Sequence, residues 1–243
     1  MTPFAKSITL LSFGLLLCLA STCSWAKKTI PLFNAQYTLH HNSFEIGQVA
    51  LSVKQLSEQH TYQLTSTTTN SGITRFFRDD EVLEVSQFNV SGNQLKAHSY
   101  LLKKDSKSEQ KETRVSFNWE QMHVVNTTNK HSWNMPINGS EIDKALMQVA
   151  LMLDLNTSTG SLTYQVADGG RLKQYTFTPL AREQIKVNDT LYDSIKLARK
   201  KDDKPLITTY WCATALHNLP VLIQRKKTYG LFEMRLKSAT FNH

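Results

Sequence analysis

The sequence is poor in the residues that cross-link a small extracellular fold. It contains three cysteines in 243 residues, and two of them, Cys18 and Cys23, lie near the N-terminus. If that N-terminal segment is removed, Cys212 remains alone and no internal disulfide can form. This excludes disulfide-stapled toxin and growth-factor scaffolds. Packing of a core must then stabilise the fold, and a chain of this length can bury a substantial one.

A hydrophobic run long enough to cross a membrane is also lacking. The apolar run Ile8–Ala20 is shorter than the roughly 20 residues that a spanning helix needs. Lys6 precedes this run and a small-x-small exit ending at Ala26 follows it, which is the layout of a secretory signal peptide. We therefore predict cleavage between Ala26 and Lys27, and export of residues 27–243 to the periplasm of a Gram-negative bacterium, without a transmembrane segment.

The motifs of the commonest hydrolases and nucleotide-binding enzymes are absent as well. There is no Gly-x-Ser-x-Gly elbow, P-loop, dinucleotide-binding glycine triplet or His-Glu-x-x-His helix. His40 and His41 are adjacent, but neighbours on a strand face opposite ways and cannot readily chelate one ion. The β-favouring run that contains Cys212 indicates a buried structural thiol. We predict no catalytic residue, no metal site and no cofactor, and hence no enzyme.

One acidic run keeps an enzymatic alternative open. Asp79, Asp80 and Glu81 follow one another, and paired carboxylates that face each other across a cleft hydrolyse glycosidic bonds. The simpler interpretation is a solvated turn that leads into a strand at Val82–Val90. A hydrolase of envelope polymers is therefore the weakest of the functions considered.

Basic residues outnumber acidic ones, and the formal net charge is +8. The two densest basic groups are Lys103, Lys104, Lys107 and Lys111, and then Arg199, Lys200, Lys201 and Lys204. Each group lies where a turn between two strands is expected, so we predict solvated hairpin tips; the alternative is a weak attraction to anionic envelope surfaces. Because the chain carries an export signal and no recognition motif, we predict no nucleic-acid partner.

Period-2 alternation of apolar and polar residues dominates the rest of the chain. It is clear in the runs Val49–Val53, Val115–Trp119, Leu162–Val166 and Phe232–Leu236, and turn-forming clusters such as Asp168–Gly170 separate such runs. Successive side chains on a strand point to opposite faces. The pattern therefore predicts roughly ten to twelve antiparallel strands in a sheet with one covered and one wet face.

Helical spacing of apolar residues occurs at Glu141–Leu155. Ser140 is expected to cap this helix, and Asp143 lies in its acidic first turn. Methionines widen the apolar face, so we expect the helix to be buried on or inside the curved sheet. A second, shorter helical turn is predicted near Gly72–Phe77.

These patterns predict a mainly β fold: a large curved antiparallel sheet, a half-barrel or open barrel, with one buried helix. Neither a repeat nor a Pro-rich hinge marks a second domain, so we predict a single domain over residues 27–243. A sheet curled round one helix can leave an apolar cavity between them. The aromatic and methionine candidates for its lining are Phe76, Phe77, Phe88, Trp119, Trp133, Met147, Met152 and Met234.

An ordered series of short motifs along the chain resembles the bacterial envelope family called domain of unknown function 3108. The motifs are Ala35–Leu39, Glu45–Val49, Ser86–Phe88, Ala97–Tyr100, the helix containing Asp143, Val166–Gly169, Tyr210–Trp211 and Leu219–Val221. The chain departs from the family at Lys144–Leu146, where a small polar residue is expected, and at Cys212 after Trp211. The resemblance implies a periplasmic β-sheet protein of unassigned function, with no established catalytic residues to carry over.

Two functions follow from this architecture. The first is a non-enzymatic binding or carrier module whose cavity holds an acyl chain or another apolar, lipid-like envelope ligand, by analogy with lipoprotein carriers of similar shape. The second is a structural or interaction protein that assists envelope assembly by offering a sheet edge or the wet face to a protein partner.

Overall fold

A computed structural model of the protein describes residues 29–56, 60–71, 81–92, 94–106, 110–201 and 208–242. The expected cleavage site at Ala26 and Lys27 and the turn expected near Gly72–Phe77 lie outside these residues. The described residues form fifteen strands of one sheet, more than the ten to twelve expected. Tight turns separate some of these strands, as at Asn129 between β7 and β8, whose φ is 53°.

The elements have the following bounds. They are β1 (Leu32–His41), β2 (Phe44–Gln55), β3 (Thr61–Asn70), β4 (Glu81–Ser91), β5 (Gln94–Asp105), β6 (Gln110–Asn118), β7 (His123–Thr128), β8 (His131–Pro136), β9 (Ile142–Asp143), α2 (Leu146–Asp154), β10 (Leu162–Ala167), β11 (Leu172–Val187), β12 (Thr190–Lys201), β13 (Thr208–Ala213), the 3-10 helix η1 (Thr214–Leu216), β14 (Leu219–Lys227) and β15 (Gly230–Asn242).

The described strands form one continuous sheet in the order β8-β7-β6-β5-β4-β3-β2-β1-β15-β14-β13-β12-β11-β10-β9. It consists of two antiparallel meanders, β1–β8 and β10–β15, which are joined where β1 pairs with β15. The short strand β9 adds in parallel to β10. The sheet is open, with β8 and β9 as its two edges, so the predicted fold class is confirmed.

The link between those two edges forces the sheet to curl. Fifteen strands at about 4.8 Å spacing would make a flat sheet roughly 67 Å wide, whereas the segment from Pro136 to Ile142 reaches at most about 20 Å. The edges therefore approach each other, and the Trp133 ring on β8 lies only 2.6 Å from where a Cβ on Gly170 would stand. Register shifts in the β1–β15, β4–β5 and β11–β12 pairs, typical of bulges, add to the curvature.

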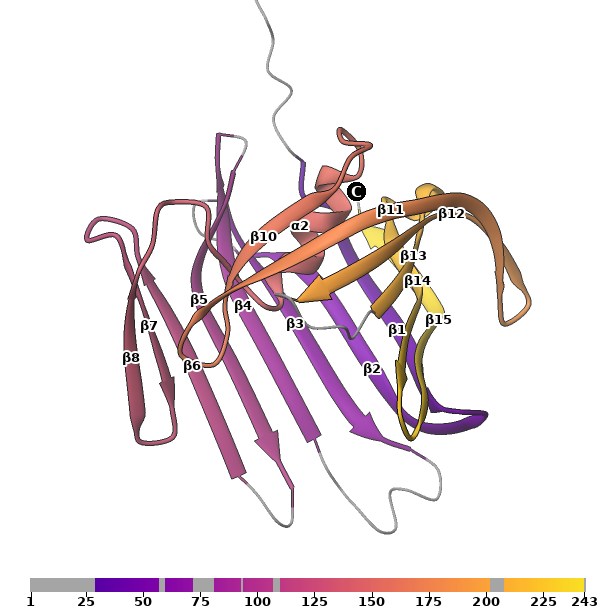
Figure 1. The fold of residues 1–243 in the computed structure, drawn as a ribbon, viewed down its shortest axis with the longest axis horizontal. Coiled ribbons are helices and arrows are strands. Elements are labelled where there is room, and N and C mark those ends of the chain that lie inside the picture. The colour runs from indigo at the N-terminus through magenta and orange to yellow at the C-terminus, as the bar shows by residue number, and fades with distance from the viewer. Residues whose placement is uncertain are drawn as a thin grey trace, which may run out of the picture.

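The helix α2 lies within the curve of the sheet (Figure 1). Seven of its nine residues are buried, including Met147 and Met152, so the expected deep burial is confirmed. Alternate strand residues such as Val49, Leu51 and Val53 are buried with it in one apolar cluster. Among the described residues, no helix is long and apolar enough to span a bilayer.

The helix begins five residues later than the spacing predicted, and Ser140 does not cap it. The Glu141 carboxylate accepts the backbone N–H groups of Asn138, Gly139 and Ser140 at 3.0–3.1 Å, which closes a turn instead of starting a helix. Ile142 then pairs with Val166 in the sheet. The first apolar residue of the predicted segment, Ile142, therefore belongs to an extended strand, which helical spacing alone cannot reveal.

Burial of α2 predicts the response to shortening its side chains. Leu146 is 0% exposed, so Leu146→Ala should lower the free energy of unfolding by about 3 kcal/mol through lost contacts and a residual cavity. Leu180 on β11 is 56% exposed, and Leu180→Ala should change it by less than about 0.5 kcal/mol. Urea unfolding of both variants measures the difference, and equal losses would contradict the observed packing.

Candidate functional site

The concave side of the sheet holds two adjoining cavities. The first, which we call the apolar chamber, has a volume of about 320 Å³ and lies between α2 and the strands β1–β3, β14 and β15. Its apolar walls are formed chiefly by Leu39, Val49, Leu51, Leu64, Met147, Leu151, Phe177, Ile223 and Met234. These residues come from inward positions of the strands and from the face of α2 that meets the sheet.

The second cavity, which we call the polar chamber, has a volume of about 500 Å³ and lies over strands β4–β7. Inward positions of β5 and β6 supply Tyr100, Lys104, Lys111 and Thr113 to its wall. Three residues, Thr68, Glu84 and Lys144, belong to the walls of both chambers, so the two cavities are neighbours. Both volumes are within or close to the range of small-molecule sites.

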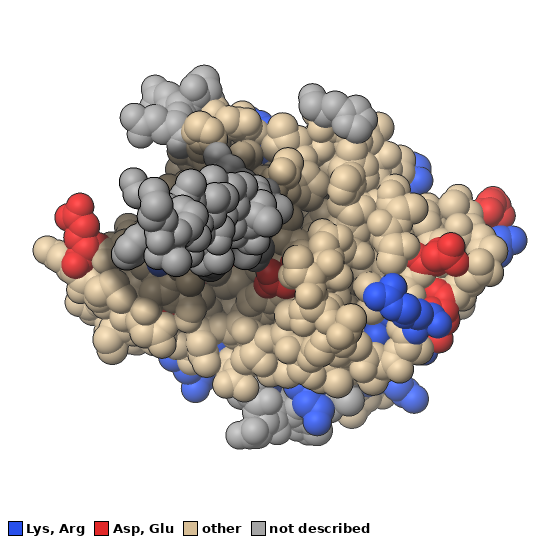
Figure 2. Space-filling view, turned by 90° about the horizontal axis from the view of Figure 1, so that it is seen from above, with Lys and Arg blue, Asp and Glu red and all other residues tan. Residues whose placement is uncertain are grey.

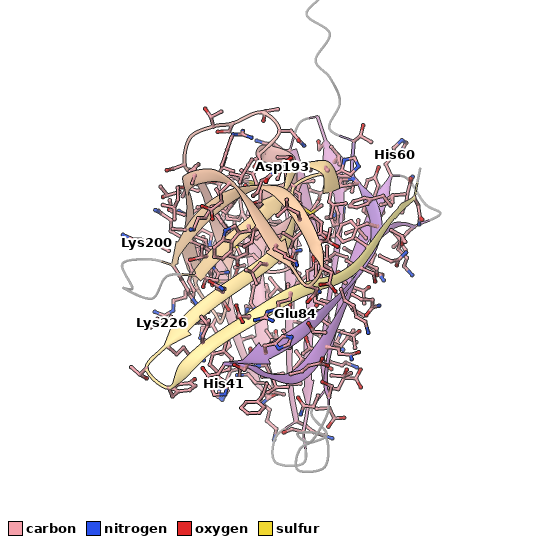
Figure 3. The ribbon with its side chains drawn as sticks, turned by 90° about the vertical axis from the view of Figure 1, so that its right-hand side faces the viewer. His41, His60, Glu84, Asp193, Lys200 and Lys226 are labelled. Atoms are coloured by element: carbon pink, nitrogen blue, oxygen red, sulfur yellow. The ribbon has the colours of Figure 1, made fainter. Side chains whose placement is uncertain are left out.

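Figures 2 and 3 show where charged residues lie relative to the concave side of the sheet that holds the two chambers. Glu84 lies inside the curve of the sheet, whereas His41 and Lys226 lie near hairpins at its rim (Figure 3). In the view from above, Lys and Arg side chains are scattered round the periphery and form no single patch (Figure 2). The charges that matter for the chambers are therefore the few that point inward.

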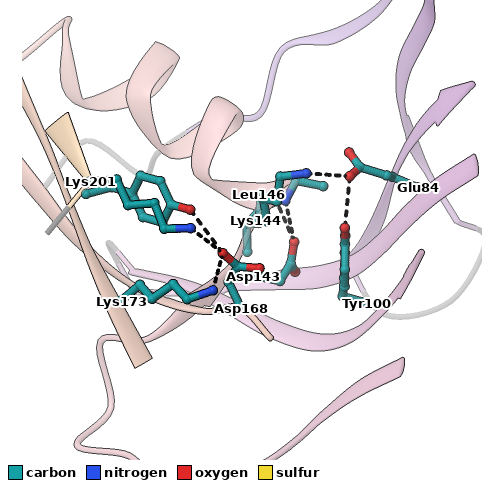
Figure 4. Close-up of polar contacts among 10 residues, drawn as sticks. Glu84, Tyr100, Asp143, Lys144, Leu146, Asp168, Lys173 and Lys201 are labelled. Atoms are coloured by element: carbon teal, nitrogen blue, oxygen red, sulfur yellow. Dashed lines mark hydrogen bonds and ion pairs between the residues drawn. The ribbon is translucent and has the colours of Figure 1, made fainter. Parts of the chain in front are cut away.

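Asp143 of β9 fixes the start of α2 against β4. One carboxylate oxygen accepts the backbone N–H groups of Ala145 and Leu146, both at 2.9 Å (Figure 4). The other oxygen accepts the Ser86 hydroxyl of β4 at 2.6 Å. The side chain is fully buried. Burial raises the pKa of Asp143 to about 6, although the three hydrogen bonds oppose that shift.

Glu84 joins β4 to the beginning of the helix. Its carboxylate accepts hydrogen bonds from the Tyr100 hydroxyl at 2.9 Å and from the Lys144 ammonium at 2.9 Å (Figure 4). Burial and the Glu84 charge both raise the pKa of Tyr100, which keeps the phenol protonated as a donor. This arrangement holds Lys144 at the junction of the two chambers.

Asp168, in the turn after β10, gathers a second set of donors. Its carboxylate accepts from Lys173 at 2.8 Å, Lys201 at 3.0 Å and the Tyr175 hydroxyl at 3.1 Å (Figure 4). Burial raises the pKa of Asp168, but the hydrogen bonds and charges of the two lysines outweigh it and hold the pKa well below its usual range. Asp168 is therefore a carboxylate that is satisfied by its own neighbours.

Two hydrogen-bond donors in the walls of the chambers have no acceptor among the described residues. The side-chain amide of Asn126 is fully buried in the wall of the polar chamber, and its Nδ2 has no partner there. The Nε2 of Gln148, in the wall of the apolar chamber, is likewise unpaired. A buried donor without an acceptor costs about 1–3 kcal/mol, so such groups call for an explanation.

The predicted lining residues fall into three groups. Met147 and Met234 line the apolar chamber. Four others line neither chamber. Phe88 and Met152 are fully buried in the core. Trp119 donates to the Ala97 carbonyl at 2.8 Å, and Trp133 packs over Gly170 at the sheet edge. Phe76 and Phe77 lie outside the described residues.

The other candidates from the sequence have ordinary surroundings. Cys212 is buried, as expected, and burial raises the pKa of its thiol. His40 and His41 hydrogen-bond to the Thr38 hydroxyl and the Tyr229 carbonyl, respectively, and the described residues contain no group of three side chains able to hold a metal. Glu81 is exposed at the start of β4, while Asp79 and Asp80 lie outside the described residues.

The basic groups do not behave as uniform hairpin tips. Strand alternation sends Lys103 to the convex face, where it meets Glu112 at 3.7 Å, but turns Lys104 and Lys111 into the polar chamber. In the second group, Lys201 binds Asp168 and Arg199 lines the apolar chamber. The sequence contained this signal, because Tyr100, Leu102 and Lys104 occupy alternate positions of one strand face.

Comparisons with known proteins give a family and a fold. A family model described as "Protein of unknown function (DUF3108)" matches residues 36–237. No curated protein matches the chain. Among solved structures, the chain is similar to the "Crystal Structure of Beta-barrel-like Protein of Domain of Unknown Function DUF1849 from Brucella abortus", with a TM-score of 0.62 and 10% sequence identity over 88% of this chain and 98% of that one. At this identity the likeness shows the fold alone.

The raised pKa of Asp143 predicts that this residue lowers the stability of the folded protein as the pH rises. Between about pH 4 and pH 6 the folded protein retains a proton that the unfolded chain has lost, so the Asp143 contribution to stability falls as the pH rises. Asp143→Asn keeps the acceptor for Ala145 and Leu146 but removes this titration. The free energy of unfolding of the variant, relative to the wild type, should rise by about 3 kcal/mol from pH 4 to pH 7 in urea titrations. A relative stability that stays flat over this range would contradict the assignment.

For Asp168 we predict the opposite pH dependence of stability. Because its pKa is lowered, its contribution is present above about pH 4 and lost as the pH falls through the folded-state pKa. Asp168→Asn should cost about 1.5–3 kcal/mol at pH 7, and the cost should shrink on acidification. Asp193→Asn, at an exposed position of β12, is the matched control and should have a small effect at either pH. Equal effects of the two substitutions at pH 7 would refute the role given to Asp168.

Proposed function

We propose that this chain, which belongs to the DUF3108 family, is a non-enzymatic binding or carrier module for an apolar, lipid-like ligand of the bacterial envelope. The observation that carries the proposal is the apolar chamber, whose wall consists largely of aliphatic, methionine and aromatic side chains, with a few polar ones such as Arg199 and Gln148. Burial of apolar ligand surface against such walls contributes about 25 cal/mol for each Å² removed from water. An acyl chain fits that chemistry.

The polar groups around the chamber support binding in preference to catalysis. Each inward carboxylate of the described residues is held by fixed donors: Asp143 by Ser86 and the start of α2, Glu84 by Tyr100 and Lys144, and Asp168 by its lysines. A general acid or base needs an exchangeable proton directed at a substrate. These carboxylates instead accept hydrogen bonds from neighbouring groups of the protein, as carboxylates with a structural role do.

The N-terminal segment supports a location for this activity. A signal peptide ending at Ala26 would deliver the chain to the periplasm, where acyl chains are abundant in both membranes and in lipoproteins. A carrier there has to shield its cargo from water, and a sheet that curls round α2 provides a covered concave face for that purpose.

A second candidate is the interaction protein that assists envelope assembly. It is favoured by β8, which forms an edge of the sheet and is exposed along most of its length, with the Trp133 side chain 40% exposed. An edge strand offers unpaired backbone groups to which a partner strand can add. This candidate requires no ligand in the chambers.

Native mass spectrometry of the mature protein, purified from a periplasmic extract without detergent, tests the two candidates directly. A stoichiometric adduct identified as lipid in a parallel organic extract supports the carrier. A bare protein mass, together with an unchanged melting temperature when monomyristoylglycerol is added, contradicts the carrier and favours the interaction protein. A bound ligand at 100 times its Kd should stabilise the fold by about 2.7 kcal/mol.

Filling the apolar chamber should abolish binding without unfolding the protein. Ser66 on β3 faces the chamber, and Ser66→Phe should occupy part of its volume and remove the stabilisation by monomyristoylglycerol. The next residue, Thr67, faces the other side of the same strand, so Thr67→Phe is the matched control and should leave ligand stabilisation intact. Equal ligand-induced shifts in Tm for the two variants would refute the apolar chamber as the binding site.

A further inference from the structure

Two lysines lie opposite each other in the wall of the polar chamber without a counter-ion among the described residues. Lys104 of β5 and Lys111 of β6 are direct cross-strand partners, and both line this chamber. Like charges directly opposite each other destabilise a sheet. The carboxylates Glu84 and Asp168 do not relieve the pair, because they bind Lys144, Lys173 and Lys201 instead.

A second, independent observation comes from β7. Asn126 lines the same chamber, is completely buried, and leaves its Nδ2 donor without an acceptor in the described part of the chain. The two lysines are donors and both are positively charged, and the buried Asn126 amide adds a further donor to the same wall. An occupant that pairs with the lysines must present acceptor oxygens and negative charge.

We propose that the polar chamber binds the anionic head group, a phosphate or a carboxylate, of an amphiphile whose acyl chain lies in the apolar chamber. This inference rests on the proposed lipid-binding function and specifies the class of lipid. The shared walls at Thr68, Glu84 and Lys144 make the two chambers neighbours, as one ligand with a head and a tail requires. Glu84 at that junction does not repel the head group strongly, because the Lys144 ammonium lies 2.9 Å from its carboxylate.

A pair of ligands with the same acyl chain isolates the head group. Myristoyl lysophosphatidic acid and monomyristoylglycerol differ by one phosphate, and both are titrated below their aggregation concentrations by calorimetry. The phosphate form should bind at least about tenfold more tightly, because charge-assisted hydrogen bonds are the strong ones. Its affinity should fall as salt is raised from 50 to 500 mM, whereas that of the neutral ligand should not.

Two double variants with the same change in charge test the residues. Lys104→Gln with Lys111→Gln removes the inward pair, and Lys103→Gln with Arg114→Gln removes two cations from the convex face of the same strands. The first should lose the preference for the phosphate form, and the second should keep it. The first should also melt at an equal or higher temperature than the wild type without ligand, because the repulsion is gone.

The outcomes separate this inference from the function on which it rests. If neither ligand binds the wild-type protein, the lipid-binding function fails, and the inference fails with it. If both bind with equal affinity, or if the inward double variant keeps the preference, lipid binding stands and the head-group site is refuted. Inorganic phosphate alone is titrated in parallel, and binding as tight as that of the lipid would identify a phosphate site without a lipid and overturn the inference.

Discussion

The short link between β8 and β9 is the constraint on which the rest of the structure depends. Those strands are the two edges of the sheet, yet they follow each other closely along the chain. A wide sheet whose edges are tied together has to roll up, and its concave face then needs something to cover it. The residues that complete the link lead directly into α2, so the segment that ties the edges also supplies the helix that fills the curve.

The buried Asp143 carboxylate shows how this closure is made specific. It connects Ser86 of β4 to the first turn of α2, and the neighbouring Lys144 reaches Glu84 on the same strand. Hydrophobic packing alone is non-directional and would allow the helix to slide along the concave face. The two polar contacts fix its position, and that position divides the concave space into an apolar chamber beside the helix and a polar one beyond its start.

The sequence allowed the sheet to be predicted because alternation is local. Val49, Leu51 and Val53 alternate with polar residues, and each is buried as expected. The start of the helix was not predictable in this way, because Glu141 folds back onto preceding N–H groups and Ile142 pairs with β10, which is distant in sequence. Local spacing cannot show which apolar residues a distant strand will take.

The chambers were harder to predict for a related reason. Aromatic and methionine residues were expected to line the cavity, but Phe88 and Met152 are buried in the core. Large apolar side chains fill a tightly packed interior, so they leave little open space around them. Open space remains instead where smaller or charged residues occupy inward positions, as at Ser66, Thr68 and Lys104. The alternating pattern shows that these positions point inward only once the apolar residues of the same strand have shown which face is inward.

The same alternation also bears on how a fold of this kind acquires different functions. The DUF1849 protein from Brucella abortus shares the architecture at 10% sequence identity, so the curled sheet does not depend on particular residues. Inward positions that are not needed for packing can change without altering register, since substitution leaves the alternation intact. The chemical character of the concave face therefore depends on a small set of inward positions on β3 and β5–β7. In this chain those positions carry a pair of lysines and a buried amide, groups that cost stability because they have no counter-ion or acceptor among the described residues.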